Sequence, residues 1–180
     1  MSADFERIDS ETLLEGKIAT VRRDRFRYDD GEEADREIVS HPGAVAIVAH
    51  DGEHVYLVRQ PREAIGIPDL LEIPAGKLDE EGEDPLATAQ RELAEEIGKQ
   101  AGSWEPLGWF FTSPGFTDER VHLFLATDIS DVGERPEVEE NERIDVEVRP
   151  VSELDVIIAE NRDSKTLIAL LKLKDRLARA

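Results

Sequence analysis

Three carboxylates recur at helical spacing near the middle of the chain. Glu92, Glu95 and Glu96 stand at positions i, i+3 and i+4 of a segment that favours a helix. Their Cβ atoms would then lie about 5–6 Å apart on one face, where like charges repel each other. Clustered oxygen ligands suit a hard divalent ion such as Mg²⁺, which would offset that repulsion. The sequence therefore predicts a cation site along this helix.

The elements around these carboxylates can be placed from caps, turns and apolar patterns. Asp84 is a candidate N-cap, Pro85 suits the first helical position and Gly98 suits the stop. The remaining patterns predict strands at residues 17–28, 36–39, 44–49, 55–58, 70–73, 108–112, 121–127 and 144–148. Two further helices are predicted with Ser152 and Ser164 as their N-caps, and the last runs to about Ala178 with Leu167, Leu170, Leu171 and Leu177 on its buried side. This mixture indicates an α+β fold with a sheet sandwiched between helices.

Composition excludes several classes of function. The formal net charge of the 180 residues is −20, which repels phosphate backbones, so we expect no nucleic-acid or membrane partner. The chain has no cysteine, which excludes disulfides, thiolate metal sites and cysteine nucleophiles. The N-terminal segment MSADFERIDSE lacks the apolar core of a signal peptide, and the run Ala44–Ala49 is too short to span a membrane. We therefore expect a cytoplasmic location.

The segment 76–98 resembles the Nudix box, the signature of Nudix hydrolases. The match comprises Gly76, Glu83, Arg91-Glu92-Leu93, Glu95-Glu96 and Gly98. Two departures are a one-residue insertion in the loop between Gly76 and Glu83, and Lys99 in place of an aliphatic residue. The resemblance implies Mg²⁺, with Mn²⁺ as a substitute, held by Glu92, Glu95, Glu96 and the Ala75 carbonyl. It also implies a Nudix-type mixed sheet between helices in residues 44–180, preceded by an antiparallel ribbon in residues 1–43. Arg91 would neutralise Glu83 or Glu95.

The sequence after the box narrows this resemblance. Ser113-Pro114-Gly115 places a proline sixteen positions past Gly98, which is similar to the ADP-ribose pyrophosphatase branch of the superfamily. The branch implies substrate contacts from Pro114, Gly115, Glu119 and Arg62. It also implies that Arg36 and Glu37 are contributed by a partner subunit. Arginine suits such a role because its planar fork binds phosphate oxygens in pairs.

The residue that activates water is implied to lie in the acidic stretch before the last strand. By its place there, Glu140 resembles the catalytic base and Glu142 a further metal ligand, although the roles of Glu139, Glu140 and Glu142 are open to exchange. Glu95 is a further catalytic candidate, which would bind an additional ion or pair with Arg91.

The resemblance implies hydrolysis of ADP-ribose to AMP and ribose 5-phosphate by a homodimer that exchanges its N-terminal strands. Two alternatives stay open. One keeps the fold and changes the substrate to another nucleoside diphosphate sugar, a dinucleoside polyphosphate or an oxidised nucleotide. The other is a non-catalytic ADP-ribose sensor, which the intact carboxylates of the box disfavour.

Overall fold

The computed structural model describes residues 4–78, 82, 84–133 and 143–179. The chain divides into two compact units. The first, which we call the N-terminal unit, comprises Met1–Gly43 and Phe110–Arg120. The second, which we call the main unit, comprises Ala44–Trp109 and Val121–Ala180.

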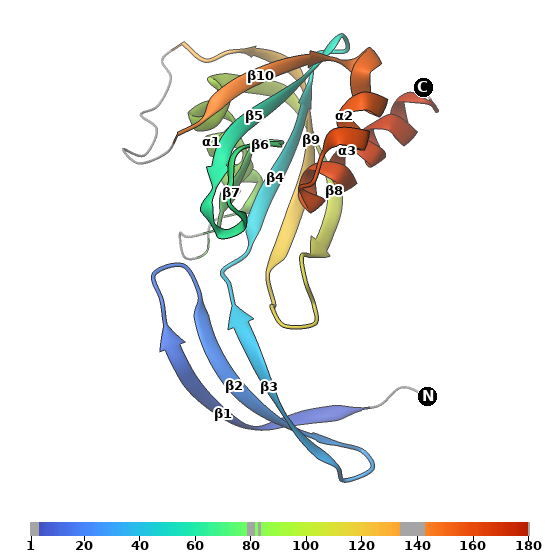
Figure 1. Cartoon of the computed structure of the whole chain (residues 1–180). Coiled ribbons are helices and arrows are strands. Elements are labelled where there is room, and N and C mark those ends of the chain that lie inside the picture. The colour runs from blue at the N-terminus through green and yellow to red at the C-terminus, as the bar shows by residue number, and fades with distance from the viewer. Residues whose placement is uncertain (1–3, 79–81, 83, 134–142, 180) are drawn as a thin grey trace. The chain divides into compact units, whose positions relative to one another are not determined.

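The N-terminal unit contains a three-stranded antiparallel sheet (Figure 1). Its strands follow chain order and are β1 (Phe5–Glu15), β2 (Thr20–Tyr28) and β3 (Glu33–Ser40). Arginines 23, 25 and 27 of β2 pair with acidic side chains on the flanking strands. The expected antiparallel ribbon is therefore present, with β1 as a strand that the sequence analysis did not assign. β1 is exposed along nearly its whole length, so it lacks the apolar alternation that would have marked it.

The main unit is built on a seven-stranded mixed sheet, in which β4 lies between the antiparallel β5 and the parallel β9. The strand order is β10-β5-β4-β9-β8, with β6 paired to β5 and β7 paired to β4. The strands are β4 (Ala44–His50), β5 (His54–Arg62), β6 (Ile67–Glu72), β7 (Ala75–Lys77), β8 (Lys99–Phe111), β9 (Arg120–Asp131) and β10 (Asp145–Pro150). The helices are α1 (Pro85–Ile97), α2 (Leu154–Glu160) and α3 (Ser164–Leu177), with short 3-10 turns at Glu63–Ile65 and Val151–Glu153.

Helices cover both faces of this sheet (Figure 1). Val45, Ile47 and Ala49 of β4 share one buried cluster with Leu93 of α1. Side chains alternate between the two faces of a strand, so Ala46 and Val48 face the other side, where α3 packs against β4. The predicted α+β sandwich is confirmed, and β4, buried from Val45 to Ala49, lies at its centre.

Helix ends show where local signals succeed and fail. Helix α1 begins at Pro85 and ends at Gly98, which adopts the left-handed conformation at φ 66°, as predicted. The N-cap of α3 is Asp163 rather than the predicted Ser164, because the Asp163 carboxylate accepts the Thr166 N–H. Ser152 lies in a 3-10 turn, and α2 begins at Leu154.

The buried face of α3 also differs from the prediction. Leu170 is buried as expected, whereas Leu171 and Leu177 are exposed. The positions that complete the buried face are Thr166, Ala169 and Leu173. In the part of the chain that the structure describes, no helix has the length and apolarity needed to cross a membrane.

Candidate active site

The predicted carboxylates of α1 meet the bend that follows β6. The Glu96 side chain is almost fully buried, and its Oε2 accepts the Ala75 N–H at 3.0 Å. Gly76 lies against Glu92, because a Cβ atom built on Gly76 would stand 2.0 Å from Glu92 Oε1. Both carboxylates therefore contact the Ala75–Gly76 dipeptide. Glu96 accepts the Ala75 N–H, and Glu92 occupies the space that a side chain at Gly76 would fill.

Arg91 neutralises part of the charge on this helix face. Its Nη1 lies 3.0 Å from Glu92 Oε1 and 3.0 Å from Glu95 Oε2. The predicted pairing of Arg91 with Glu95 is confirmed, whereas Glu83, the other expected partner, lies outside the described residues. Because one guanidinium is shared between two carboxylates, Arg91 holds these side chains together but does not cancel their charge.

The donor chemistry of this site fits a hard divalent cation. Glu92 and Glu96 offer carboxylate oxygens, and Ala75 is the predicted carbonyl ligand. The described residues contain no group of three or more acidic, histidine or cysteine side chains placed to hold a metal ion. Magnesium commonly takes only one or two carboxylates from the protein and completes its shell with water and substrate phosphates. The predicted Glu140 and Glu142 lie outside the described residues.

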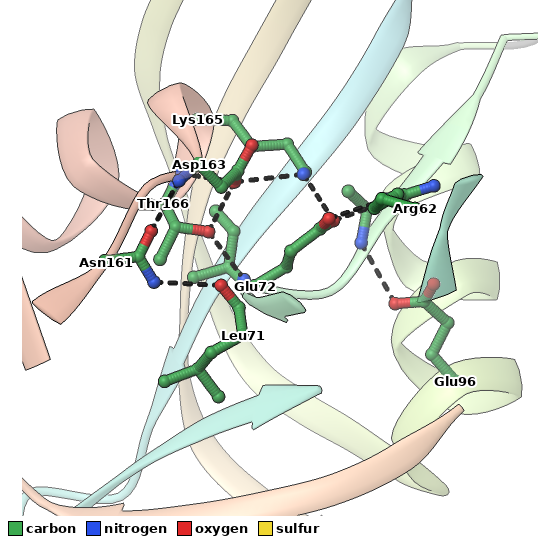
Figure 2. A network of polar contacts seen from close by, with 10 residues as sticks. Arg62, Leu71, Glu72, Glu96, Asn161, Asp163, Lys165 and Thr166 are labelled. Carbon is green, nitrogen blue, oxygen red and sulfur yellow. Dashed lines mark hydrogen bonds and ion pairs between the residues drawn. The ribbon is translucent and has the colours of Figure 1, made fainter. Parts of the chain in front are cut away.

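Arg62, a predicted substrate ligand, is held by a buried carboxylate. Its Nε and Nη2 donate to the two oxygens of Glu72, each at 2.6 Å, while the side chain remains 40% exposed. Glu72 is only 1% exposed and also accepts a hydrogen bond from Lys165 Nζ, so its charge is shared between two cations (Figure 2). The hydrogen bond to Glu72 raises the pKa of Arg62 although burial opposes that shift.

The predicted residues Pro114, Gly115 and Glu119 lie in the loop between β8 and β9, which belongs to the N-terminal unit. Glu119 Oε2 accepts the Thr112 hydroxyl at 2.7 Å, and its Oε1 lies 3.6 Å from His41 Nδ1. This loop therefore presents Glu119 in a defined orientation.

The aspartate next to Glu119 anchors the loop to β3. The Asp118 carboxylate accepts the Ser40 hydroxyl at 2.7 Å and the His41 N–H at 2.9 Å. Burial alone would raise the pKa of Asp118, but these hydrogen bonds lower it. Asp118 is therefore an ionised anchor at neutral pH, and sequence reasoning assigned it no role.

Arg36 and Glu37, the other predicted substrate residues, lie on β3 with exposed side chains. Arg36 Nη2 donates to the Tyr28 hydroxyl at 3.2 Å, and Glu37 Oε1 accepts from Arg23 at 3.3 Å. Both predicted residues thus stand on the surface of the N-terminal sheet.

Several residues around Glu72 were missed by sequence reasoning. They are Glu72 itself, Asn161 at the end of α2, and three residues at the start of α3, namely Asp163, Lys165 and Thr166. The one local signal was the position of Glu72, a charged residue inside the apolar run 70–73. A carboxylate buried in such a run needs a hydrogen-bonding or cationic partner. The partners themselves lie about ninety residues along the chain, beyond the reach of a local pattern.

Residues 39–171 match the NUDIX domain, and residues 5–39 match the nucleoside diphosphate sugar hydrolase N-terminal domain. The chain is 49% identical to an ADP-ribose pyrophosphatase of Mycobacterium tuberculosis over 140 residues, covering 77% of this chain and 67% of the relative. It is 40% identical to an ADP-ribose pyrophosphatase of Bacillus subtilis over 183 residues, covering 98% and 97%.

A solved structure described as an ADP compounds hydrolase shares the fold. It aligns with a TM-score of 0.84 at 20% identity and covers 99% of this chain and 95% of the other. Since the domain match spans most of the chain and a relative that is 40% identical is covered nearly completely, this protein belongs to the Nudix hydrolase family.

Proposed function

We propose that this protein hydrolyses the pyrophosphate bond of ADP-ribose to AMP and ribose 5-phosphate in the presence of Mg²⁺. The observation that carries the proposal is the meeting of Glu92 and Glu96 with the Ala75–Gly76 bend, a set of oxygen donors suited to a hard cation. The two relatives named ADP-ribose pyrophosphatase support the choice of substrate.

In the proposed reaction, the cation and the protein side chains have separate roles. A bound Mg²⁺ would offset diphosphate charge and lower the pKa of a coordinated water. Glu92, Glu96 and the Ala75 carbonyl would hold it, with Glu95 or Glu142 as further ligands, and Mn²⁺ would substitute. Arg91 limits the repulsion between Glu92 and Glu95.

Arg62 is suited to orient the diphosphate. Glu72 occupies the Nε–Nη2 edge of its guanidinium, which fixes the plane of the group. The remaining edge, with Nη1, is the edge that a phosphate would approach. Glu140 would accept the proton of the attacking water, as the family resemblance implies. Pro114, Gly115 and Glu119 would contact the substrate from the β8–β9 loop.

Purified protein and a Glu96→Gln variant, incubated with a panel of nucleotides, test the proposal. Glutamine keeps an oxygen for the Ala75 N–H but removes the charge, so the fold should persist while turnover falls about a hundredfold or more. Released phosphate, measured after phosphatase treatment, reports turnover. If ADP-ribose ranks below other substrates, or if the variant turns over normally, the proposal is wrong.

A second candidate keeps the chemistry and changes the substrate to another nucleoside diphosphate sugar. The match of residues 5–39 to the nucleoside diphosphate sugar hydrolase N-terminal domain favours it. The same nucleotide panel separates the two candidates, because each predicts a different best substrate.

We also propose that the protein is a homodimer in which residues 1–43 form the interface and residues 44–180 form the hydrolase. The N-terminal unit exposes several large apolar side chains, including Phe5 and Leu14 of β1 and Ile18 in the turn between β1 and β2, each 60% exposed. Burying such side chains against a second copy would be favourable. Arg36 and Glu37 would then reach the site of the partner.

A further inference from the structure

The segment Leu71–Ala75, which leads into the predicted metal site, is hydrogen-bonded to the end of α2 and the start of α3. Asn161 Nδ2 donates to the Leu71 carbonyl at 2.8 Å. The Ile73 N–H donates to Thr166 Oγ1 at 2.9 Å (Figure 2). Both bonds join the backbone of this segment to side chains about ninety residues away.

The Thr166 hydroxyl has a fixed orientation. It donates to Asp163 Oδ2 at 2.6 Å, and the Thr166 N–H donates to the same oxygen at 2.9 Å. Because a hydroxyl has one proton, its lone pairs are left to accept from Ile73. Asp163 is in turn fixed by its own N–H, which donates to Asn161 Oδ1 at 2.8 Å. Thr166 is fully buried, so water does not replace this bond.

A charged pair reinforces the same junction. Lys165 Nζ lies 3.0 Å from Asp163 Oδ2 and also donates to the buried Glu72. Glu72 in turn holds Arg62. We call Asn161, Asp163, Lys165 and Thr166 the α3 clamp.

The other end of the segment carries the predicted metal site. The Pro74 carbonyl accepts the Ile47 N–H at 2.8 Å, and the Ala75 N–H donates to Glu96 at 3.0 Å. Residues 71, 73, 74 and 75 each have a backbone hydrogen bond to another element. A displacement at Ile73 is therefore transmitted within two residues to Ala75, the predicted carbonyl ligand.

We propose that Thr166 is a positioning residue for the metal site, acting through the Ile73 N–H on the placement of Ala75 and Glu96. This role rests on the proposed function only in that both require a divalent cation at Glu92 and Glu96. Under this proposal, α3 contributes to the affinity of the site for its cation. Helix α3 lies on the opposite face of the sheet from α1. Outer contacts of this kind typically change metal affinity or activity by about tenfold to a hundredfold.

The test compares Thr166→Val with wild type by titrating Mn²⁺ alone into the protein, followed calorimetrically, and by measuring kcat and KM separately. Valine keeps the shape of threonine but removes the acceptor. We expect Mn²⁺ affinity and kcat to fall by about tenfold or more, with KM within about twofold of wild type. Thr166→Ser, which keeps the hydroxyl, should restore both.

Thr88→Val is the matched control. Thr88 is a fully buried threonine near the start of α1, and its hydroxyl contacts the Asp84 carbonyl rather than the segment 71–75. This variant should bind Mn²⁺ with the wild-type affinity. Unchanged Mn²⁺ affinity in Thr166→Val, or an equal loss in Thr88→Val, would overturn the proposal.

A second variant keeps the proposal testable if Thr166→Val does not fold. Asn161→Ala removes the bond to the Leu71 carbonyl and also the acceptor of the Asp163 N–H, which loosens the carboxylate that orients Thr166. Weaker Mn²⁺ binding would support the proposal and unchanged binding would overturn it. Wild-type protein that binds Mn²⁺ but leaves ADP-ribose intact would overturn only the proposed substrate. Wild-type protein that binds no Mn²⁺ would overturn both proposals.

Discussion

Among single residues, Gly76 is important because it has no Cβ atom, which leaves room for the Glu92 side chain. A Cβ atom at this position would stand 2.0 Å from both Cδ and Oε1 of Glu92, far inside any allowed contact. The backbone of Gly76 is not in the left-handed region, so alanine would fit the chain and the clash would fall on Glu92.

We therefore predict that Gly76→Ala lowers kcat by about a hundredfold, because a displacement of about 1 Å has effects of that size. Thermal unfolding should be nearly unchanged. Steady-state kinetics and a melting curve measure the two quantities. Gly133→Ala is the control, since a Cβ atom there meets nothing within 4 Å. Wild-type kcat in Gly76→Ala would show that Glu92 has room to move without loss.

The carboxylates of α1 and their partner Arg91 could be predicted because they are close in sequence and helical periodicity puts them on one face. Glu72 could be recognised from the sequence as a charged residue in an apolar strand, but the residues that bind it could not be predicted. Lys165 lies 93 residues from Glu72, and the residue that caps α3 is Asp163 rather than its neighbour Ser164. The Asp163 carboxylate accepts both the N–H and the hydroxyl of Thr166, which makes Asp163 the N-cap in place of Ser164.

The β4–β5 hairpin gives a prediction at the scale of elements. Its turn is organised by Asp51, whose Oδ1 accepts the N–H groups of Glu53 and His54 and whose Oδ2 accepts the Tyr56 hydroxyl. Burial opposes ionisation, but these hydrogen bonds lower the pKa of Asp51 to about 2.

The folded-state pKa of Asp51 lies below its unfolded value near 3.8, so this carboxylate stabilises the hairpin above that pH. The stabilisation should disappear as the pH falls from about 4 to about 2. Because the side chain is partly exposed, we expect Asp51→Asn to cost only about 1 kcal/mol at pH 7. Urea unfolding of wild type and variant at several pH values measures the difference. A difference that grows on acidification would contradict this account.

Sequence signals placed elements best where a turn residue was unambiguous. The limits of α1 follow from Pro85 and Gly98, and the β4–β5 hairpin follows from Asp51-Gly52. β1 was not predicted, because its stability comes from pairing with β2 and not from an apolar face of its own.

The proposed exchange of Arg36 between subunits gives a prediction for the whole molecule. Arg36→Ala and Glu96→Gln should each inactivate both sites of their own homodimer. If Arg36 acts across the interface, a hybrid dimer has one site with an intact Glu96 from one subunit and an intact Arg36 from the other. Co-refolding the two inactive variants in equal amounts should then restore about a quarter of wild-type activity.

Activity of the refolded mixture and light scattering of each sample measure this outcome. The control is the same procedure applied to each variant alone, which should restore nothing. A mixture that stays inactive although dimers form would place Arg36 in its own subunit's site, and an active monomer would rule out the exchange altogether.

The hydrogen bond between Ile73 and Thr166 joins positions 93 residues apart. During synthesis the box and its carboxylates leave the ribosome long before their anchor does. A nascent chain that has reached only α1 already contains Ile47 and Glu96, which bond to Pro74 and Ala75, but it lacks the Thr166 hydroxyl that accepts the Ile73 N–H. The proposed role of Thr166 therefore predicts that the metal site reaches its full affinity only after α3 has been translated.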